Sequence, residues 1–144
     1  MAQSSLASPV ASQLSSVELV QSLFSAFGRG DIAYIVNQVT DDCQWLFPAP
    51  GILPVGGEYQ GPAGVSRFFQ VLSDSENITK FEPREYFPKG DDVVVLGHEE
   101  MRSKKTGQSA CTHWSMVFRV KDGKVYEWEI YLDTAAYAKA HGAL

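Results

Sequence analysis

The chain has 144 residues, of which 44% are hydrophobic and 20% charged, and its formal net charge is −5. This length and composition predict one globular domain that is large enough to bury its own core. The acidic balance and the lack of a Lys/Arg cluster disfavour nucleic acid and anionic membrane surfaces as partners. No apolar run is long enough to cross a membrane.

The chain begins with a segment rich in serine and alanine. Residues 1–14 are expected to be a mobile tail, and residues 15–144 a single domain. The tail lacks the basic and continuous apolar regions of a secretory signal. Because Cys43 and Cys111 form no spaced framework, we interpret them as reduced thiols of a cytoplasmic protein.

Two helices are expected next. Ser15 and Glu18 have the spacing of a capping box, and an apolar stripe follows at helical intervals until Gly28 and Gly30 end it. Asp31 can cap a second helix directly afterwards. So short a link between two helices predicts a helical hairpin.

A strand, a loop and a third helix follow. Cys43–Phe47 is typical of a strand, and Pro48 closes it. The segment Ala49–Gly61 is rich in proline and glycine and is expected to be a long loop across the surface or over a pocket mouth. Pro62 suits the first turn of a helix that runs to about Leu72.

The second half of the chain predicts a meander of strands and a short last helix, residues 134–140. Asp122-Gly123 separates two β-rich runs, and both residues tolerate the positive φ of a type I′ hairpin turn. Both arms of this hairpin carry bulky residues at odd and even positions. We therefore expect a sheet covered on both faces, by helices on one and by a partner subunit on the other. The expected strands are 77–87, 92–102, 109–120 and 125–133.

Helices gathered on one side of an antiparallel sheet make an α+β domain. We expect a cone-shaped, curved antiparallel (mixed) sheet that wraps around three helices. An apolar cavity should remain between the two layers.

At this point the sequence resembles the SnoaL-like and ketosteroid isomerase-related proteins of the nuclear transport factor 2-like superfamily. The resemblance covers about residues 16–141 and implies the cone-shaped α+β fold. The superfamily includes isomerases, hydratases, cyclases and hydrolases, so the fold alone selects no activity. The segments that carry the resemblance are Leu23–Asp31, Asp41–Gly51, Tyr59–Leu72, Phe81–Gly97, Phe118–Val125 and Glu129–Tyr137.

The resemblance implies particular catalytic positions. Ketosteroid isomerases place an aspartate base before the proline that ends the first strand, and a tyrosine in the first helix. This chain has Phe47 and Leu23 at those places, so we reject steroid isomerisation. SnoaL-like cyclases place an acid/base aspartate at the end of the last strand, a position matched here by Asp133.

Asp133 has two compatible interpretations, a general acid/base at the cavity or the N-cap of the last helix. His113 and His98, with Glu100 beside them, could support it in a proton relay. Alternatively the histidines are structural, and Glu99 and Glu100 lie near a solvated edge. We expect no metal site, because the histidines lack metal-binding spacing.

The last strand can face either way. If its odd positions point inward, Glu129, Tyr131 and Asp133 form a polar strip in the cavity, and Trp128 faces a dimer partner. If the orientation is reversed, Trp128 lines the cavity. We favour the first arrangement, because the resemblance places the family aspartate at the pocket.

Aromatic residues are numerous enough to line a pocket for a flat or hydrophobic ligand, although they could equally form a plain core. We expect a homodimer, formed through the sheet, that binds a small hydrophobic or polyketide-like molecule without a cofactor. Acid/base isomerisation, cyclisation or hydration would fit such a pocket. The alternatives are a non-catalytic carrier and a dimeric interaction domain. The aromatic candidates are Trp45, Phe47, Tyr59, Phe68, Phe69, Phe87, Trp114 and Phe118.

Overall fold

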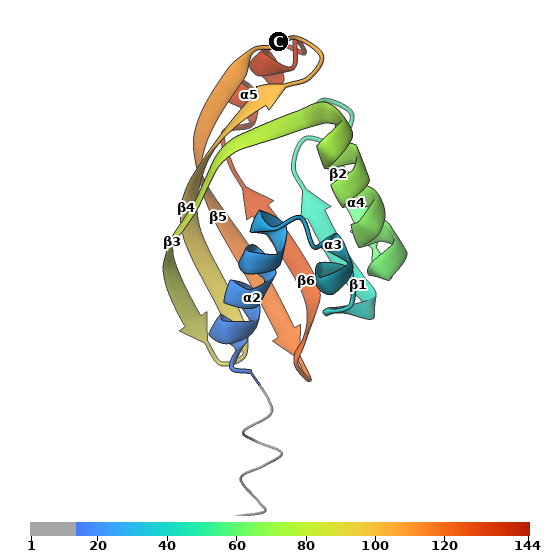
Figure 1. The fold of residues 1–144 in the computed structure, drawn as a ribbon, viewed down its shortest axis with the longest axis vertical. Helices are drawn as coiled ribbons and strands as arrows, with labels where there is room; N and C mark the ends of the chain where they lie inside the picture. Colours follow the sequence, from blue (N-terminus) through green and yellow to red (C-terminus); the bar gives the residue numbers. More distant parts are fainter. Residues whose placement is uncertain (1–13) are drawn as a thin grey trace, which may run out of the picture.

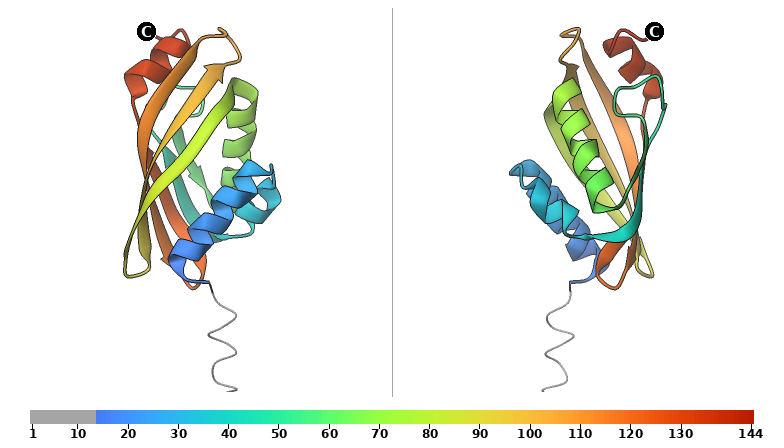
Figure 2. Two further views of the ribbon diagram at one scale, coloured as in Figure 1. Left: turned by 60° about the vertical axis from the view of Figure 1, so that its left-hand side comes forward. Right: turned by 90° about the vertical axis from the view of Figure 1, so that its right-hand side faces the viewer.

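The computed structural model describes residues 14–144, so all of the expected tail except Leu14 lies outside the described residues. A curved sheet forms one layer, three helices cover its concave face, and a fourth helix closes one end (Figures 1 and 2). The helices are α2 (Ser16–Gly28), α3 (Ile32–Val36), α4 (Gly61–Ser75) and α5 (Thr134–Ala140). The strands are β1 (Val39–Phe47), β2 (Gly57–Gln60), β3 (Glu76–Lys89), β4 (Asp92–Ser103), β5 (Ser109–Lys121) and β6 (Lys124–Tyr131).

The six strands lie in the order β2-β1-β6-β5-β4-β3. Every neighbouring pair is antiparallel except β1 and β6, which run parallel. The expected α+β class, with a mixed curved sheet around three helices, is therefore confirmed. Among the described residues, no helix is long and apolar enough to cross a bilayer.

The predicted helix starts are confirmed at the level of single hydrogen bonds. The Ser15 hydroxyl accepts from the Glu18 amide at 3.1 Å, and the Glu18 carboxylate accepts from the Ser15 amide at 3.0 Å. The Asp31 carboxylate accepts from the Tyr34 amide and begins α3. These local caps set where α2 and α3 start and how their apolar sides meet the sheet.

The hairpin turn between β5 and β6 is also confirmed. Asp122 and Gly123 have φ angles of 52° and 76°, as a type I′ turn requires. The segment expected to be only a loop, Ala49–Gly61, differs from the prediction because it includes the edge strand β2 and buries Leu53. A strand of four residues is too short to show a clear alternation in sequence.

The two faces of the sheet differ in burial. Along β6, Trp128 and Ile130 are buried under the helices, whereas Glu129 and Tyr131 point to the convex face. The expectation of an inward polar strip is therefore wrong. Successive side chains on a strand alternate in direction, so the pairing of Trp128 with Phe118 on β5 turns Glu129 and Tyr131 outward.

Strand β4 carries a second correction. Glu99 is 6% exposed on the concave side, where it shares a face with Val95 and Met101 rather than lying at a solvated edge. On the same face Gly97 leaves room for the Trp114 ring, since a Cβ at position 97 would overlap it. The face of β4 that covers the helices thus combines tight packing with one buried acid.

Helix α5 closes one end of the curved sheet (Figure 1). The Asp133 carboxylate accepts from the Ala136 amide at 3.0 Å, and its own amide donates to the Thr112 hydroxyl at 2.9 Å. This cap fixes the direction of α5. It brings Tyr137 and His141 against β4 and the start of β3.

Candidate functional site

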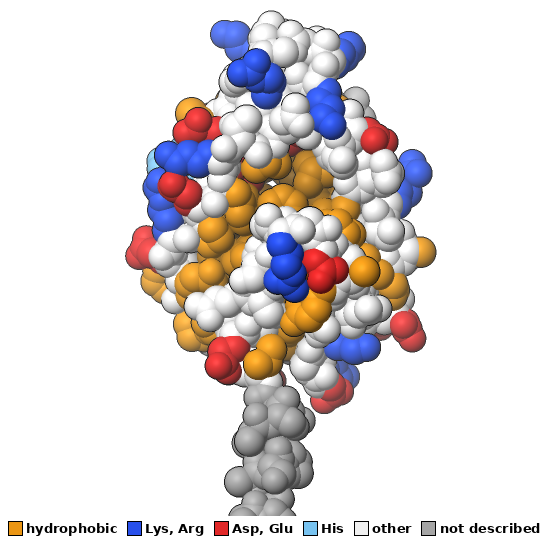
Figure 3. Space-filling model, viewed as in Figure 1, with side chains coloured by type: hydrophobic (Ala, Val, Ile, Leu, Met, Phe, Trp, Pro, Cys, Tyr) orange, Lys and Arg blue, Asp and Glu red, His pale blue; other side chains and the backbone are white. Residues whose placement is uncertain are grey.

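A cavity lies between the helices and the concave face of the sheet. Figure 3 shows a hollow there that is surrounded by hydrophobic side chains. Its volume is about 70 Å³, within about 600 Å³ of empty space that includes open solvent. A shallow groove between α2 and β3, beside Phe24 and Phe81, adjoins it. The lining residues are Leu23, Phe24, Phe27, Ile35, Trp45, Phe47, Phe68, Phe69, Leu72, Glu76, Ile78, Phe81, Glu99, Met116, Phe118, Trp128 and Ile130.

Aromatic rings form much of the wall. Trp45 from β1 stacks on Trp128 from β6 with ring centroids 4.5 Å apart, and the edge of Phe68 meets Trp128 at 5.5 Å. Phe24 and Phe81, whose centroids lie 5.6 Å apart, form the wall near α2. Such surfaces offer flat, polarizable faces to a ligand.

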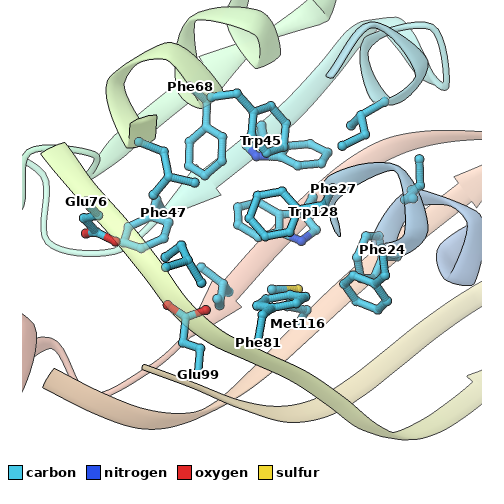
Figure 4. A pocket seen from close by; sticks show the side chains of 17 residues that line it. Phe24, Phe27, Trp45, Phe47, Phe68, Glu76, Phe81, Glu99, Met116 and Trp128 are labelled. Atoms are coloured by element: carbon cyan, nitrogen blue, oxygen red, sulfur yellow. The ribbon is translucent and has the colours of Figure 1, made fainter. Parts of the chain in front are cut away.

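Two carboxyl groups interrupt this apolar wall, and we call Glu76 and Glu99 the acidic end. They lie at one end of the cavity, and Phe24 lies at the other (Figure 4). Glu76 is 4% exposed and Glu99 6%. Burial raises the pKa of Glu76 to about 7, and burial together with the charge of Glu76 raises the pKa of Glu99 to about 7. Both groups therefore titrate near neutral pH.

Helix α5 holds Glu99 in place. The Tyr137 hydroxyl donates a hydrogen bond to Glu99 Oε2. Burial and the nearby Glu99 charge raise the pKa of Tyr137 far above its usual range, so this hydroxyl keeps its proton. The bond to Tyr137 in turn lowers the pKa of Glu99, against the larger effect of burial.

Glu76 is held in place by His141, the C-cap of α5. His141 Nε2 lies 3.0 Å from Glu76 Oε2, and His141 Nδ1 lies 3.1 Å from the Ser103 hydroxyl. Burial, and then the charge of Lys105, lower the pKa of His141, so its imidazole is uncharged at neutral pH and this contact is a hydrogen bond. The other carboxyl oxygen, Glu76 Oε1, is buried without a partner in the described part of the chain.

Most of the aromatic residues predicted from the sequence meet at this cavity. The exceptions are Tyr59, whose hydroxyl donates to the Val55 carbonyl at 2.9 Å, Trp114, which stacks on Phe81, and the exposed Phe87 and Tyr131. The predicted residues that line the cavity are Trp45, Phe47, Phe68, Phe69, Phe118 and Trp128.

The structure places the predicted catalytic residues elsewhere. Asp133 is exposed and caps α5. His98 and His113 are paired across β4 and β5, and their ring centroids lie 5.2 Å apart. The residues next to each of them in the strand point to the concave face, so both histidines point to the convex face. Glu100 lies on the same face, 3.8 Å from the Lys80 ammonium. No group of three or more metal-binding side chains occurs within residues 14–144.

Sequence reasoning missed the acidic end and its two partners. Glu76 precedes the strand expected from residue 77, and His141 lies outside every expected helix and strand. A signal existed for Glu99, because it has the same parity as Val93 and Val95 in a strand whose odd positions are apolar. An acid on a buried face is a candidate for function.

Comparison with known proteins identifies the family. The SnoaL-like domain family matches residues 20–128, while no curated protein matches the chain. A nuclear transport factor 2-like protein from Burkholderia xenovorans is 30% identical, with 90% of this chain and 98% of that one covered and a TM-score of 0.81. TerC, co-crystallised with polyporic acid, is 26% identical, with 90% and 99% covered and a TM-score of 0.80.

A more distant structure shows the fold alone. It is a protein from Catenulispora acidiphila with a ketosteroid isomerase-like fold, solved in complex with trimethylamine. It is 12% identical, with 87% of this chain and 92% of that one covered and a TM-score of 0.73. From the match over residues 20–128 and the shared architecture, the chain belongs to the SnoaL-like domain family and has the nuclear transport factor 2-like fold.

Proposed function

We propose that the protein binds a small, flat, largely aromatic molecule in the cavity and holds its polar group at the acidic end. The observation that carries this proposal is Glu76 Oε1, a buried oxygen without a partner among the described residues, on a residue that lines an otherwise apolar cavity. A buried polar atom left unpaired costs about 1–3 kcal/mol. A ligand that donates a hydrogen bond to this oxygen would remove that cost.

The shape and chemistry of the wall support an aromatic ligand. The stacked Trp45 and Trp128 rings and the edge of Phe68 offer the contacts that flat molecules prefer. TerC, a relative that is 26% identical, was co-crystallised with polyporic acid, which makes this compound a reasonable first probe. The cavity favours ligand binding over an interaction domain with a packed interior.

Acid/base catalysis is the second candidate function, of the isomerase, cyclase or hydratase type. Its support is that burial brings the pKa of Glu76 and Glu99 to about 7, where a carboxyl can give or take a proton near neutral pH. In this proposal Glu76 and Glu99 take the role that the sequence suggested for Asp133. A non-catalytic carrier would use the same cavity for binding alone.

Ligand binding can be tested by titrating the protein with polyporic acid and following the indole NMR signals of Trp45 and Trp128. We expect both signals to move, and the Glu76→Gln variant, which removes a negative charge beside this acidic probe, should bind it more tightly than the wild type. Glu129→Gln is the matched control, because Glu129 lies on the convex face. The proposal fails if neither indole signal responds, or if the two variants change the affinity equally.

Catalysis and carriage are separated by the same variants once a converted compound is found. An enzyme would lose turnover on Glu76→Gln or Glu99→Gln while it still bound the compound. A carrier would show no turnover in any form of the protein.

A further inference from the structure

We propose that the polar group of the ligand is a cation, such as a protonated amine, rather than a carboxylate or a phenolate. This inference rests on the proposed function, because it concerns the ligand of the same cavity. Among the described residues that line the cavity, the ionisable ones are Glu76 and Glu99, and no Lys, Arg or His is among them. The wall therefore offers negative charge and aromatic faces, and no positive charge.

The hydrogen-bonding capacity of the acidic end points to a donor. Glu76 Oε2 is already engaged by His141, the C-cap of α5, and Glu99 Oε2 by Tyr137 from α5. Glu76 Oε1 remains without a partner in the described part of the chain. An ammonium group carries only donors, whereas a carboxylate carries only acceptors. An ammonium between the two glutamates would satisfy Glu76 Oε1, while a carboxylate there would place like charges together.

The surrounding rings favour the same choice. Phe47 lies beside Glu76, and Trp128 faces the space between the two ends of the cavity (Figure 4). A cation over an aromatic face is attracted by the negative face of the ring, and the attraction grows when water is excluded. Two acids and several rings around a narrow space form a suitable site for an amine attached to an aromatic body.

Binding of a cation must be coupled to protons in this site. The groups that face Glu76 are His141, the C-cap of α5, the Glu99 carboxyl, and Ser103, which is paired with Glu76 across β3 and β4. Glu99 faces Tyr137 from α5. Two further titratable groups lie one step away: Cys111 from β5 is near Tyr137, and Lys105 from the β4–β5 turn is near His141.

The direction of the pH effect follows from this coupling. A cation stabilises the ionised carboxyls, so it binds more tightly as pH rises through their pKa of about 7. Displacing one proton from one such group gives about a tenfold rise in affinity between pH 6 and pH 8. A ligand that needs a protonated glutamate shows the opposite trend.

Three probes of nearly equal size separate the possibilities: 2-phenylethylammonium, 2-phenylethanol and 3-phenylpropanoate. Each is titrated into the full chain at pH 6 and pH 8, with binding followed by the indole NMR signals of Trp45 and Trp128. An alkyl amine has a pKa near the ~10 of lysine, so the first probe stays charged at both pH values. We expect it to bind most tightly at pH 8 and about tenfold more weakly at pH 6.

Variants give an independent readout. Glu76→Gln should weaken the ammonium probe about tenfold or more while changing the affinity for 2-phenylethanol less than about twofold, since only the ion loses its countercharge. Glu129→Gln should leave all affinities unchanged. If Glu76→Gln does not fold, the wild-type pH dependence still decides.

The inference about charge is overturned if 2-phenylethanol or 3-phenylpropanoate binds as tightly as the ammonium probe at pH 8. It is also overturned if the affinity for the ammonium probe does not change with pH. In either case the cavity still binds a ligand and the proposed function stands. If neither indole signal responds to any of the three probes or to polyporic acid, both proposals fail together.

Discussion

Replacing Glu99 with glutamine should change how the stability of the protein depends on pH. Burial raises the pKa of Glu99 from 4.5 to about 7, so between these values the folded protein holds the proton more tightly than the unfolded chain. The stability linked to this proton is complete below pH 4.5 and is lost as pH rises through 7. The amide side chain of the Glu99→Gln variant carries no such proton, so the variant should lose none of this stability.

The size of the effect follows from the two pKa values. For a single group with a pKa of 4.5 unfolded and about 7 folded, the loss of stability between pH 5 and pH 8 is about 2–3 kcal/mol. Glu99 is 6% exposed, so solvent screens this group little. The free energy of unfolding should therefore fall by about 2–3 kcal/mol less in Glu99→Gln than in the wild type over this range.

Urea unfolding at pH 5, 6, 7 and 8 measures this difference, because both proteins share all other titrating groups. Glu129→Gln removes a carboxyl from the convex face instead, and its pH profile should follow that of the wild type. Parallel pH profiles for the wild type and Glu99→Gln would refute the reasoning, since they would mean that Glu99 titrates alike in both states.

Three further predictions concern packing and assembly. Tyr137→Phe leaves the Glu99 carboxylate without its hydroxyl donor, so it should cost about 1–3 kcal/mol in urea unfolding, more at pH 8 than at pH 5. Gly97→Ala forces a Cβ into the Trp114 ring and should cost about 1–3 kcal/mol; unchanged stability would show that the ring can move aside. We also propose that the convex face, where Leu96 is 38% exposed, forms a homodimer. Light scattering should then show a dimer that Leu96→Lys weakens, and a wild-type monomer at micromolar concentration would contradict it.

Local sequence was sufficient for the elements and for the fold class. The capping box at Ser15 and the type I′ turn at Asp122 depend on a few neighbouring residues, so their patterns predicted the observed geometry. The apolar stripes of the helices and the β-rich runs then predicted helices on one face of a curved sheet. The edge strand β2 was not predicted because its four residues are too few to show a clear alternation.

The acidic end depended on tertiary structure. Glu76 and His141 are 65 residues apart in the chain, and Glu99 and Tyr137 are 38 apart, so no local pattern joins them. Which face of β6 turns inward was equally undetermined, because a shift of one residue in register reverses every side chain of a strand. Pairing across the whole sheet fixed that choice. Burial of the two carboxyl groups in the same folded interior then moved their pKa values toward neutral pH.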